Sequence, residues 1–245
     1  MPDRRRHRGP HPEDLRWFAA DVWPALRRAT RDLNWLLSRG YVRGSALKLV
    51  GDRFALAARQ RLAVARCSAA DAAVLRRRQH QIPGVALVDR PLWLDGYNVL
   101  TTVEAALAGG VLLIGSDGAM RDMASMHGSY RKVSETGPAL EMLGTGLAAR
   151  GIGEAVWLLD RPVSNSGRLK QVMEQLALDR RWPWKVELVS DPDAVLMGTE
   201  NIVATADSGI LDQCVAWFNL ARETVEQFVP QACVVDLAPT TDAAQ

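Results

Sequence analysis

Cysteine and histidine are scarce in this chain of 245 residues, and neither type is grouped. The three cysteines, Cys67, Cys214 and Cys233, are far apart and form no CxxC pair, and the four histidines are scattered. A disulfide framework and a zinc site are therefore not expected, and a reducing cytoplasm is the natural compartment.

Long apolar runs are missing as well. No stretch approaches the roughly 20 apolar residues that span a bilayer. The basic segment at residues 1–15 lacks the apolar centre of a secretory signal. We therefore expect no contact with a membrane. Apolar residues make up 48% of the chain and charged residues 24%, which is typical of a globular protein with a sizeable core.

The net charge of +2 hides two unlike halves. Residues 1–90 hold 19 Lys+Arg against 8 Asp+Glu, a balance of +11, and residues 91–245 hold 11 against 20, a balance of −9. Basic segments attract polyanions, and acidic clusters hold divalent cations. The alternative is that the arginines only solvate the outer faces of helices.

The front half has the three-and-four spacing of apolar residues that indicates amphipathic helices. Pro24 interrupts the first such stretch, residues 15–36, which predicts two helices or one kinked helix that stops at Gly40. The further helices that we expect span residues 46–50, 55–67 and 72–79.

Arginines recur along these helices, and on one surface they would neutralise several phosphates. They are Arg59, Arg61, Arg66, Arg76, Arg77 and Arg78. We therefore predict a basic α-helical domain at residues 1–82 that binds the backbone of a nucleic acid.

After residue 83, short apolar runs alternate with helical stretches. The expected strands span residues 85–88, 92–94, 111–114, 155–159, 186–189, 202–205 and 232–236. The expected helices span residues 137–149, 166–179 and 208–228. Alternating strands and helices predict an α/β domain at residues 83–245, with a mainly parallel sheet and helices on both faces.

Four of the strands end in an acid, and ligands bind beyond this edge of a parallel sheet. The acids are Asp95, Asp160, Asp207 and, after the strand at 186–189, Asp193 in preference to Asp191. Clustered carboxylates persist when a cation lies between them, and an oxygen set without His or Cys selects Mg²⁺ or Mn²⁺. Such an ion activates water and offsets phosphoryl charge. The alternative is that each acid only caps a helix or turn.

Four segments resemble one nuclease family. "LWLDGYNVL", residues 92–100, looks like the first strand of PIN-like nucleases of the NYN type, whose first metal-binding Asp lies in a D-G-Y-N motif. "VWLLDRPVSNSG", "VELVSDPDAVL" and "NIVATADSGILD" are similar to the later acidic strands. The resemblance covers residues 85–237 and implies a PIN-like fold and a metal-dependent ribonuclease. Residues 115–136 have no counterpart. The whole chain also resembles a bacterial and archaeal family of unknown function with a helical N-terminal domain.

The predicted site residues follow from these patterns. The metal ligands are Asp95, Asp160, Asp207 and Asp212, and Asp193 joins the first three as a catalytic acid. The substrate contacts are Asn98, Arg121, Arg131, Lys132, Ser164, Asn165 and Arg168. Weaker candidates are Asp117, Asp122 and Glu135, with Trp182 and Trp184 as stacking partners for a base.

The leading prediction is therefore a ribonuclease that uses Mg²⁺ or Mn²⁺ and grips RNA with its basic helical domain. One alternative is a catalytically inactive nucleic-acid-binding or adaptor protein. Another is a metal-dependent phosphatase that acts on a small molecule, which would not need an extended cationic surface. The sequence leaves open which RNA is cut, where it is cut, and the oligomeric state, a homo-oligomer included.

Overall fold

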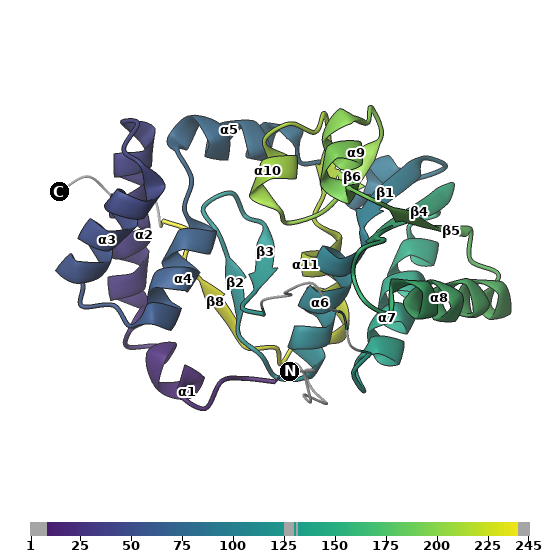
Figure 1. Ribbon diagram of the computed structural model, residues 1–245, viewed down its shortest axis with the longest axis horizontal. Coiled ribbons are helices and arrows are strands. Elements are labelled where there is room, and N and C mark those ends of the chain that lie inside the picture. The colour runs from purple at the N-terminus through teal and green to yellow at the C-terminus, as the bar shows by residue number, and fades with distance from the viewer. Residues whose placement is uncertain (1–8, 125–129, 131, 240–245) are drawn as a thin grey trace.

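The computed structural model describes residues 9–124, 130 and 132–239, and it has the predicted α/β architecture (Figure 1). Its N-terminal region is helical. The helices are α1 (Asp14–Trp17), α2 (Trp23–Ser38), α3 (Arg43–Arg53), α4 (Ala58–Cys67) and α5 (Asp71–His80). The two-helix form of the first stretch is confirmed, because Pro24 lies in the first turn of α2, where its missing N–H costs nothing.

The main sheet has five parallel strands in the order β5-β4-β1-β6-β7. They are β1 (Pro91–Asp95), β4 (Glu154–Asp160), β5 (Trp184–Val189), β6 (Ile202–Ala204) and β7 (Trp217–Phe218). The first strand of the chain is central, and the order reverses between β1 and β6. In open parallel sheets this switch point is where the carboxyl ends of the strands leave a crevice for a ligand.

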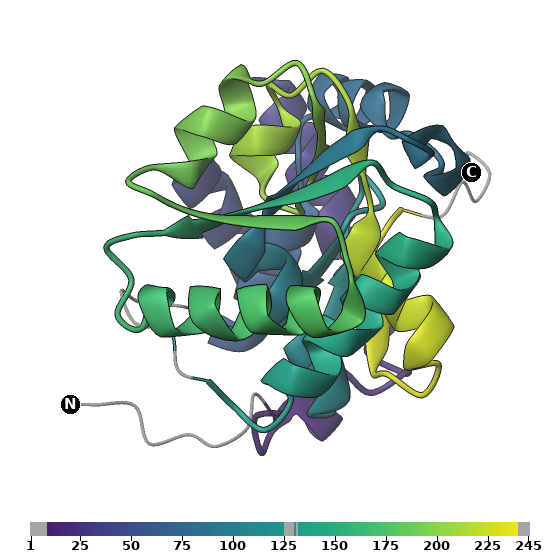
Figure 2. The same ribbon diagram turned by 90° about the vertical axis from the view of Figure 1, so that its right-hand side faces the viewer.

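Helices cover both faces of this sheet, as Figure 2 shows in an end-on view. One face packs against α6 (Gly96–Leu107), α7 (Thr136–Ala149), α8 (Ser166–Arg180) and α11 (Leu220–Phe228). The other face packs against α9 (Pro192–Gly198) and α10 (Ser208–Leu211). Helix α6 is buried on nearly all sides because it lies between this sheet and a second one.

The second sheet is a three-stranded layer, β3-β2-β8, between α6 and the helical region (Figure 1). It consists of β2 (Leu112–Ile114), β3 (Met120–Asp122) and β8 (Val234–Asp236). Side chains alternate across a strand. Accordingly, Leu112 and Ile114 join the core around α6, whereas Leu113 joins the core of α2–α4.

Several predicted elements differ in the structure. Residues 84–87 form a 3-10 turn instead of a strand, and the predicted helix at 208–228 is α10, β7 and α11. The predicted strands at 111–114 and 232–236 exist, but they lie in the second sheet. The predicted domain boundary at residue 82 follows α5, yet the core of the helical region includes Leu113, Val235 and Leu237 from the other side of that boundary.

Among the helices of the described residues, none combines the length and the apolar character that crossing a bilayer requires.

Gly96 lets α6 begin directly after β1. A Cβ atom at this position would lie 2.7 Å from the carbonyl oxygen of Leu158 and 2.6 Å from the Leu159 side chain on β4. The glycine after Asp95 is therefore required by the close approach of two backbones.

We expect Gly96→Ala to destabilise the fold by about 1–3 kcal/mol, because backbone must move to admit the methyl group. Gly167→Ala is the matched control, since Gly167 also lies in a first helical turn and has open space around it. Urea unfolding of both variants measures the difference. Equal stability of the two would show that β4 tolerates the methyl group.

Candidate active site at the switch point

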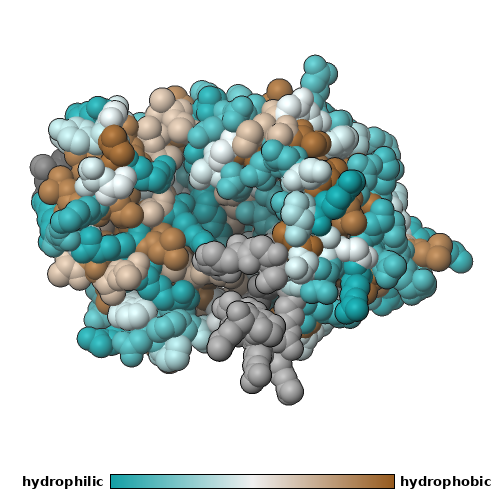
Figure 3. Space-filling model, viewed as in Figure 1, coloured by the Kyte–Doolittle hydropathy of each residue, from teal (hydrophilic) through white to brown (hydrophobic). Residues whose placement is uncertain are grey.

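A cavity of about 480 Å³ opens where β1 and β6 end. Figure 3 shows a hollow with hydrophilic side chains on this face of the molecule. Four carboxylates line the cavity, those of Asp95, Asp122, Asp193 and Asp207. Two arginines, Arg66 and Arg121, line it as well. The cavity therefore combines a cluster of acids with two guanidinium groups.

Asp95 is the most buried acid of this cluster, with 8% of its surface exposed. The hydroxyl of Thr205 donates to its Oδ2 at 2.8 Å, and the backbone N–H of Asn98 donates to its Oδ1 at 3.3 Å. Burial raises the pKa of Asp95 to about 7, the charges of Asp193 and Asp207 add to the rise, and these hydrogen bonds oppose it.

Hydrogen bonds join the two sides of the switch point. The side-chain oxygen of Asn98, on α6, accepts from the N–H of Ala206 at 2.8 Å. Asp207 caps α10, with Oδ1 accepting from the N–H groups of Gly209 at 2.7 Å and Ile210 at 3.2 Å. The Thr205 hydroxyl, which donates to Asp95, accepts from the N–H of Asp207 at 3.0 Å. The acids of β1 and β6 are thus held in a fixed relation.

Asp95, Asp160 and Asp207 lie at the same edge of the sheet, because β4, β1 and β6 are adjacent and parallel. Asp160, however, lies outside the cavity lining. Burial and the charge of Asp191 raise its pKa. The pKa of Asp193 is also raised, mainly by burial, then by the charge of Asp207 and then by the charge of Asp160.

The choice of Asp193 over Asp191 agrees with the geometry. Asp191 caps α9, its Oδ1 accepting from the N–H of Ala194 at 3.0 Å. Asp193, in the first turn of α9, lines the cavity.

Asp122 closes the cavity from β3. Its Oδ2 accepts from the hydroxyl of Thr102 at 3.0 Å, and its Oδ1 accepts from the N–H of Ala124 at 2.6 Å. Sequence reasoning ranked Asp122 low because β3 has only three residues and shows no apolar run. It also missed that Arg66 belongs to the same cavity, since nothing in the sequence relates α4 to β3.

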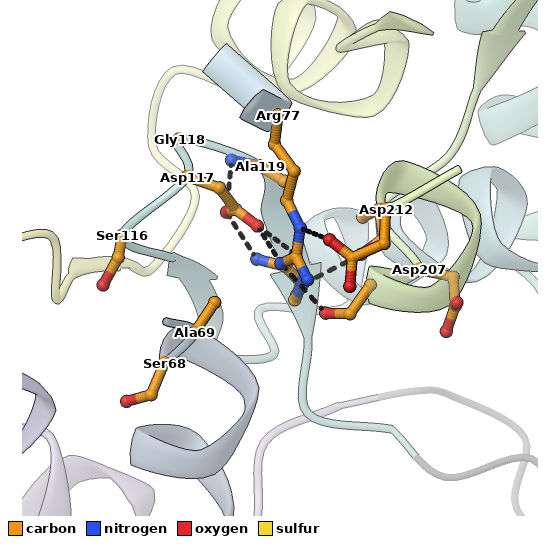
Figure 4. Close-up of polar contacts among 12 residues, drawn as sticks. Ser68, Ala69, Arg77, Ser116, Asp117, Gly118, Ala119, Asp207 and Asp212 are labelled. Atoms are coloured by element: carbon orange, nitrogen blue, oxygen red, sulfur yellow. Dashed lines mark hydrogen bonds and ion pairs between the residues drawn. The ribbon is translucent and has the colours of Figure 1, made fainter. Parts of the chain in front are cut away.

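Arg121 lines the cavity as predicted for a substrate contact, but it is buried and already bonded. Its Nε donates to the carbonyl of Ala206 at 2.9 Å, and its two terminal nitrogens donate to Asp117 at 2.9 and 2.7 Å. Arg77 of α5 donates to the same carboxylate at 2.8 Å (Figure 4). Burial alone would raise the pKa of Asp117, but Arg121 and Arg77 hold it at about 2.

Asp212 is a correction to the predicted metal ligands. It lies outside the cavity lining and accepts from Arg77 Nε at 2.8 Å (Figure 4). Arg76 Nη2 lies 3.1 Å from its Oδ1. Two arginines therefore neutralise it.

Most arginines of the predicted cationic surface on α4 and α5 are paired with acids within the protein. Arg59 pairs with Asp14, Arg61 with Asp52, Arg76 with Asp212, and Arg77 with Asp117 and Asp212. Arg66 and Arg78 donate to backbone carbonyls.

Those of the remaining predicted substrate contacts that the structure describes do not line the cavity. Ser164, Asn165 and Arg168 are exposed near the end of β4, and Asn165 Nδ2 donates to the carbonyl of Tyr130 at 3.2 Å. Lys132 is exposed, and Arg131 lies outside the described residues. Trp182 and Trp184 pack on each other at the amino end of β5, the opposite edge of the sheet.

We expect the metal-free protein to lose stability as pH rises. The folded protein binds the Asp95 proton up to about pH 7, whereas the unfolded chain releases it near pH 4. Stability from this group is thus full below about pH 4 and is lost towards pH 7, by up to about 4 kcal/mol. Asp95→Asn should remove this dependence. Urea unfolding in EDTA at pH 5 and pH 8 tests it, and parallel losses in both proteins would contradict it.

Asp117→Asn should destabilise the protein by about 3–5 kcal/mol, because it leaves two buried guanidinium groups without their shared carboxylate. Asp52→Asn is the control. Asp52 also faces two cations, Lys48 and Arg61, but it is exposed, so its loss should change little. Denaturant midpoints of the two variants give the comparison, and equal shifts would mean that the buried network is not a structural support.

Two family models match different parts of the chain. Residues 25–80 match a family described as a protein of unknown function, DUF434. Uncharacterized protein MJ0935 of Methanocaldococcus jannaschii is 27% identical over 187 residues, which is 76% of this chain and 89% of that protein. No solved structure matches the chain significantly. The model of a domain of unknown function, DUF5616, matches residues 85–223, more than half of the chain, and the protein therefore belongs to this family.

Proposed function

We propose that this protein is a phosphodiesterase that depends on Mg²⁺ or Mn²⁺ and cleaves RNA. One observation carries the proposal: four carboxylates and two guanidinium groups share one cavity at the switch point of a parallel sheet. Acids that hold a cation and arginines that bind phosphate oxygens are the two parts that phosphoryl chemistry needs.

The donor set fits a hard divalent ion. Among the described residues that line the cavity there is no His or Cys, and the ligands would be the carboxylates of Asp95, Asp193 and Asp207. No three His, Cys, Asp or Glu side chains in the described parts of the chain form a ready-made metal cluster. Mg²⁺ suits such a site because it takes one or two carboxylates and keeps several waters. When bound, the ion lowers the pKa of water and offsets phosphoryl charge.

The residues around the acids hold the reacting groups in place. Thr205 fixes one oxygen of Asp95, and Asn98 fixes the loop after β6. Arg121 is anchored through Asp117 and Ala206, so its guanidinium group stays at the cavity wall. A phosphate bound there would meet N–H groups that are already fixed in place, and such preorganisation is the basis of electrostatic stabilisation.

The choice of RNA over a small phosphate ester rests on two supports. The first is the resemblance of the D-G-Y-N segment to NYN-type nucleases. The second is an outer stripe on α2, made of Arg28, Arg31, Trp35 and Arg39. Arg28 and Arg31 are exposed and make no ion pair among the described residues. Trp35 is 51% exposed beneath the guanidinium group of Arg39, 3.6 Å from the ring centre. Arginine with an exposed aromatic ring suits a single strand.

Asp95→Asn should lower Mn²⁺-dependent cleavage of RNA by orders of magnitude while leaving RNA affinity intact, because the acid acts on the ion and the stripe binds the strand. Asp191→Asn is the control, since Asp191 lies on the same edge but only caps α9, and Asn caps equally well. Cleavage of a labelled oligoribonucleotide and its anisotropy give the two readouts.

The outcomes separate the rival functions. An Asp95→Asn protein that cleaves at the wild-type rate removes the acid cluster from the mechanism. A wild-type protein that binds RNA without cutting it in Mn²⁺ indicates an adaptor. Hydrolysis of p-nitrophenyl phosphate in the absence of any RNA cleavage indicates a phosphatase.

A further inference from the structure

Arg66 comes from a different part of the chain than the acids it faces. It lies on α4, within the residues 25–80 that match DUF434, whereas the acids lie within the 85–223 match to DUF5616. The cavity is thus built from both regions. The helical region contributes a cationic wall to it.

The guanidinium group of Arg66 is fixed mainly by backbone carbonyls, and its one ion pair in the described structure is long. Its Nη1 donates to the carbonyl of Asp122, and its Nη2 donates to the carbonyl of Ala124 at 3.0 Å. The nearest carboxylate oxygen in the described structure, Oδ1 of Asp122, is 3.8 Å from Nη1, beyond hydrogen-bond distance. A guanidinium group has five N–H donors, so two carbonyls leave donors free.

Arg59, on the same helix, shows the contrast. Its side chain makes two hydrogen bonds to the buried carboxylate of Asp14, one of them from Nη2 at 2.8 Å. It lies outside the cavity lining. One arginine of α4 therefore has a structural carboxylate partner, and the other presents its charge to a cavity with 28% of its side chain exposed.

We propose that Arg66 is the phosphate-binding residue of this site, and that it holds the non-bridging oxygens of the substrate phosphate opposite the acid cluster. The inference rests on the proposed function and gives the helical region a specific part in it. The two backbone carbonyls orient the planar fork, so that little freedom is lost when a phosphate binds. A phosphate would be repelled by the carboxylates unless cations offset its charge. The metal ion among the acids would do so on one side, and Arg66 on the other.

The experiment is calorimetric titration with inorganic phosphate in Mg²⁺ buffer, which needs no turnover. Arg66→Gln should weaken phosphate binding by about tenfold to a hundredfold, the effect of losing a charged hydrogen-bond donor. Arg66→Lys should fall between it and the wild type, because a point charge lacks the fork. Arg59→Gln is the matched control and should bind phosphate like the wild type. In cleavage assays, Arg66→Lys should raise KM more than it lowers kcat.

Melting temperatures identify any variant that fails to fold. If Arg66→Gln does not fold, Arg66→Lys, which keeps the charge, provides the test. Unchanged phosphate affinity in both folded variants overturns the role of Arg66, and so does a wild type that binds phosphate no better than they do. Phosphate binding that depends on Arg66, in a protein that hydrolyses no phosphodiester, supports this inference and overturns the proposed function. An effect of equal size in Arg59→Gln assigns the loss to α4 as a whole and also overturns the inference.

Discussion

The position of the cavity walls depends on the carboxylate of Asp117, which two buried arginines share. Arg77 brings α5 to it, and Arg121 brings β3 to it while also reaching the carbonyl of Ala206 after β6. A buried ion pair contributes little net stability compared with an apolar contact of the same volume. Its effect here is geometric, because three segments that are distant in the sequence must meet at one point with defined angles.

The acid cluster differs from the Asp117 network, because its carboxylates lie close to one another. Hydrogen bonds hold Asp95 and Asp207 at the ends of β1 and β6, so these two acids cannot move apart to relieve their repulsion. The raised pKa of Asp95 expresses this, since burial and its neighbours favour the neutral form. The two halves of the site thus differ: each acid is paired with arginines around Asp117, whereas the acids around Asp95 face one another. A ligand that carries positive charge to one side and negative charge to the other satisfies both Asp95 and Arg66.

Local patterns in the sequence account for much of the fold and for part of the site. Apolar periodicity locates most helices and strands, and the alternation of the two places the acids of β1, β4 and β6 on one edge. The limits also have physical causes. Helix α6 has almost no solvent-exposed surface because it is buried between the two sheets, and β3 and β7 are too short to show a period. The arginines of α4 and α5 look free in the sequence, but the partners of Arg77 are 40 and 135 residues away.

The second sheet affects the order in which the protein folds. The helical region builds its core partly on Val235 and Leu237, and Arg27 of α2 donates to the carbonyl of Asp236, 209 residues along the chain. During synthesis the ribosome releases these residues long after α2–α4. Until β8 has been synthesised, part of the apolar surface of α2–α4 therefore stays exposed to solvent. Contacts between residues that are far apart in the sequence slow folding, and they prolong the time for which hydrophobic surface is exposed. The helical region precedes β8 in the chain, but its hydrophobic core is complete only after β8 has been synthesised.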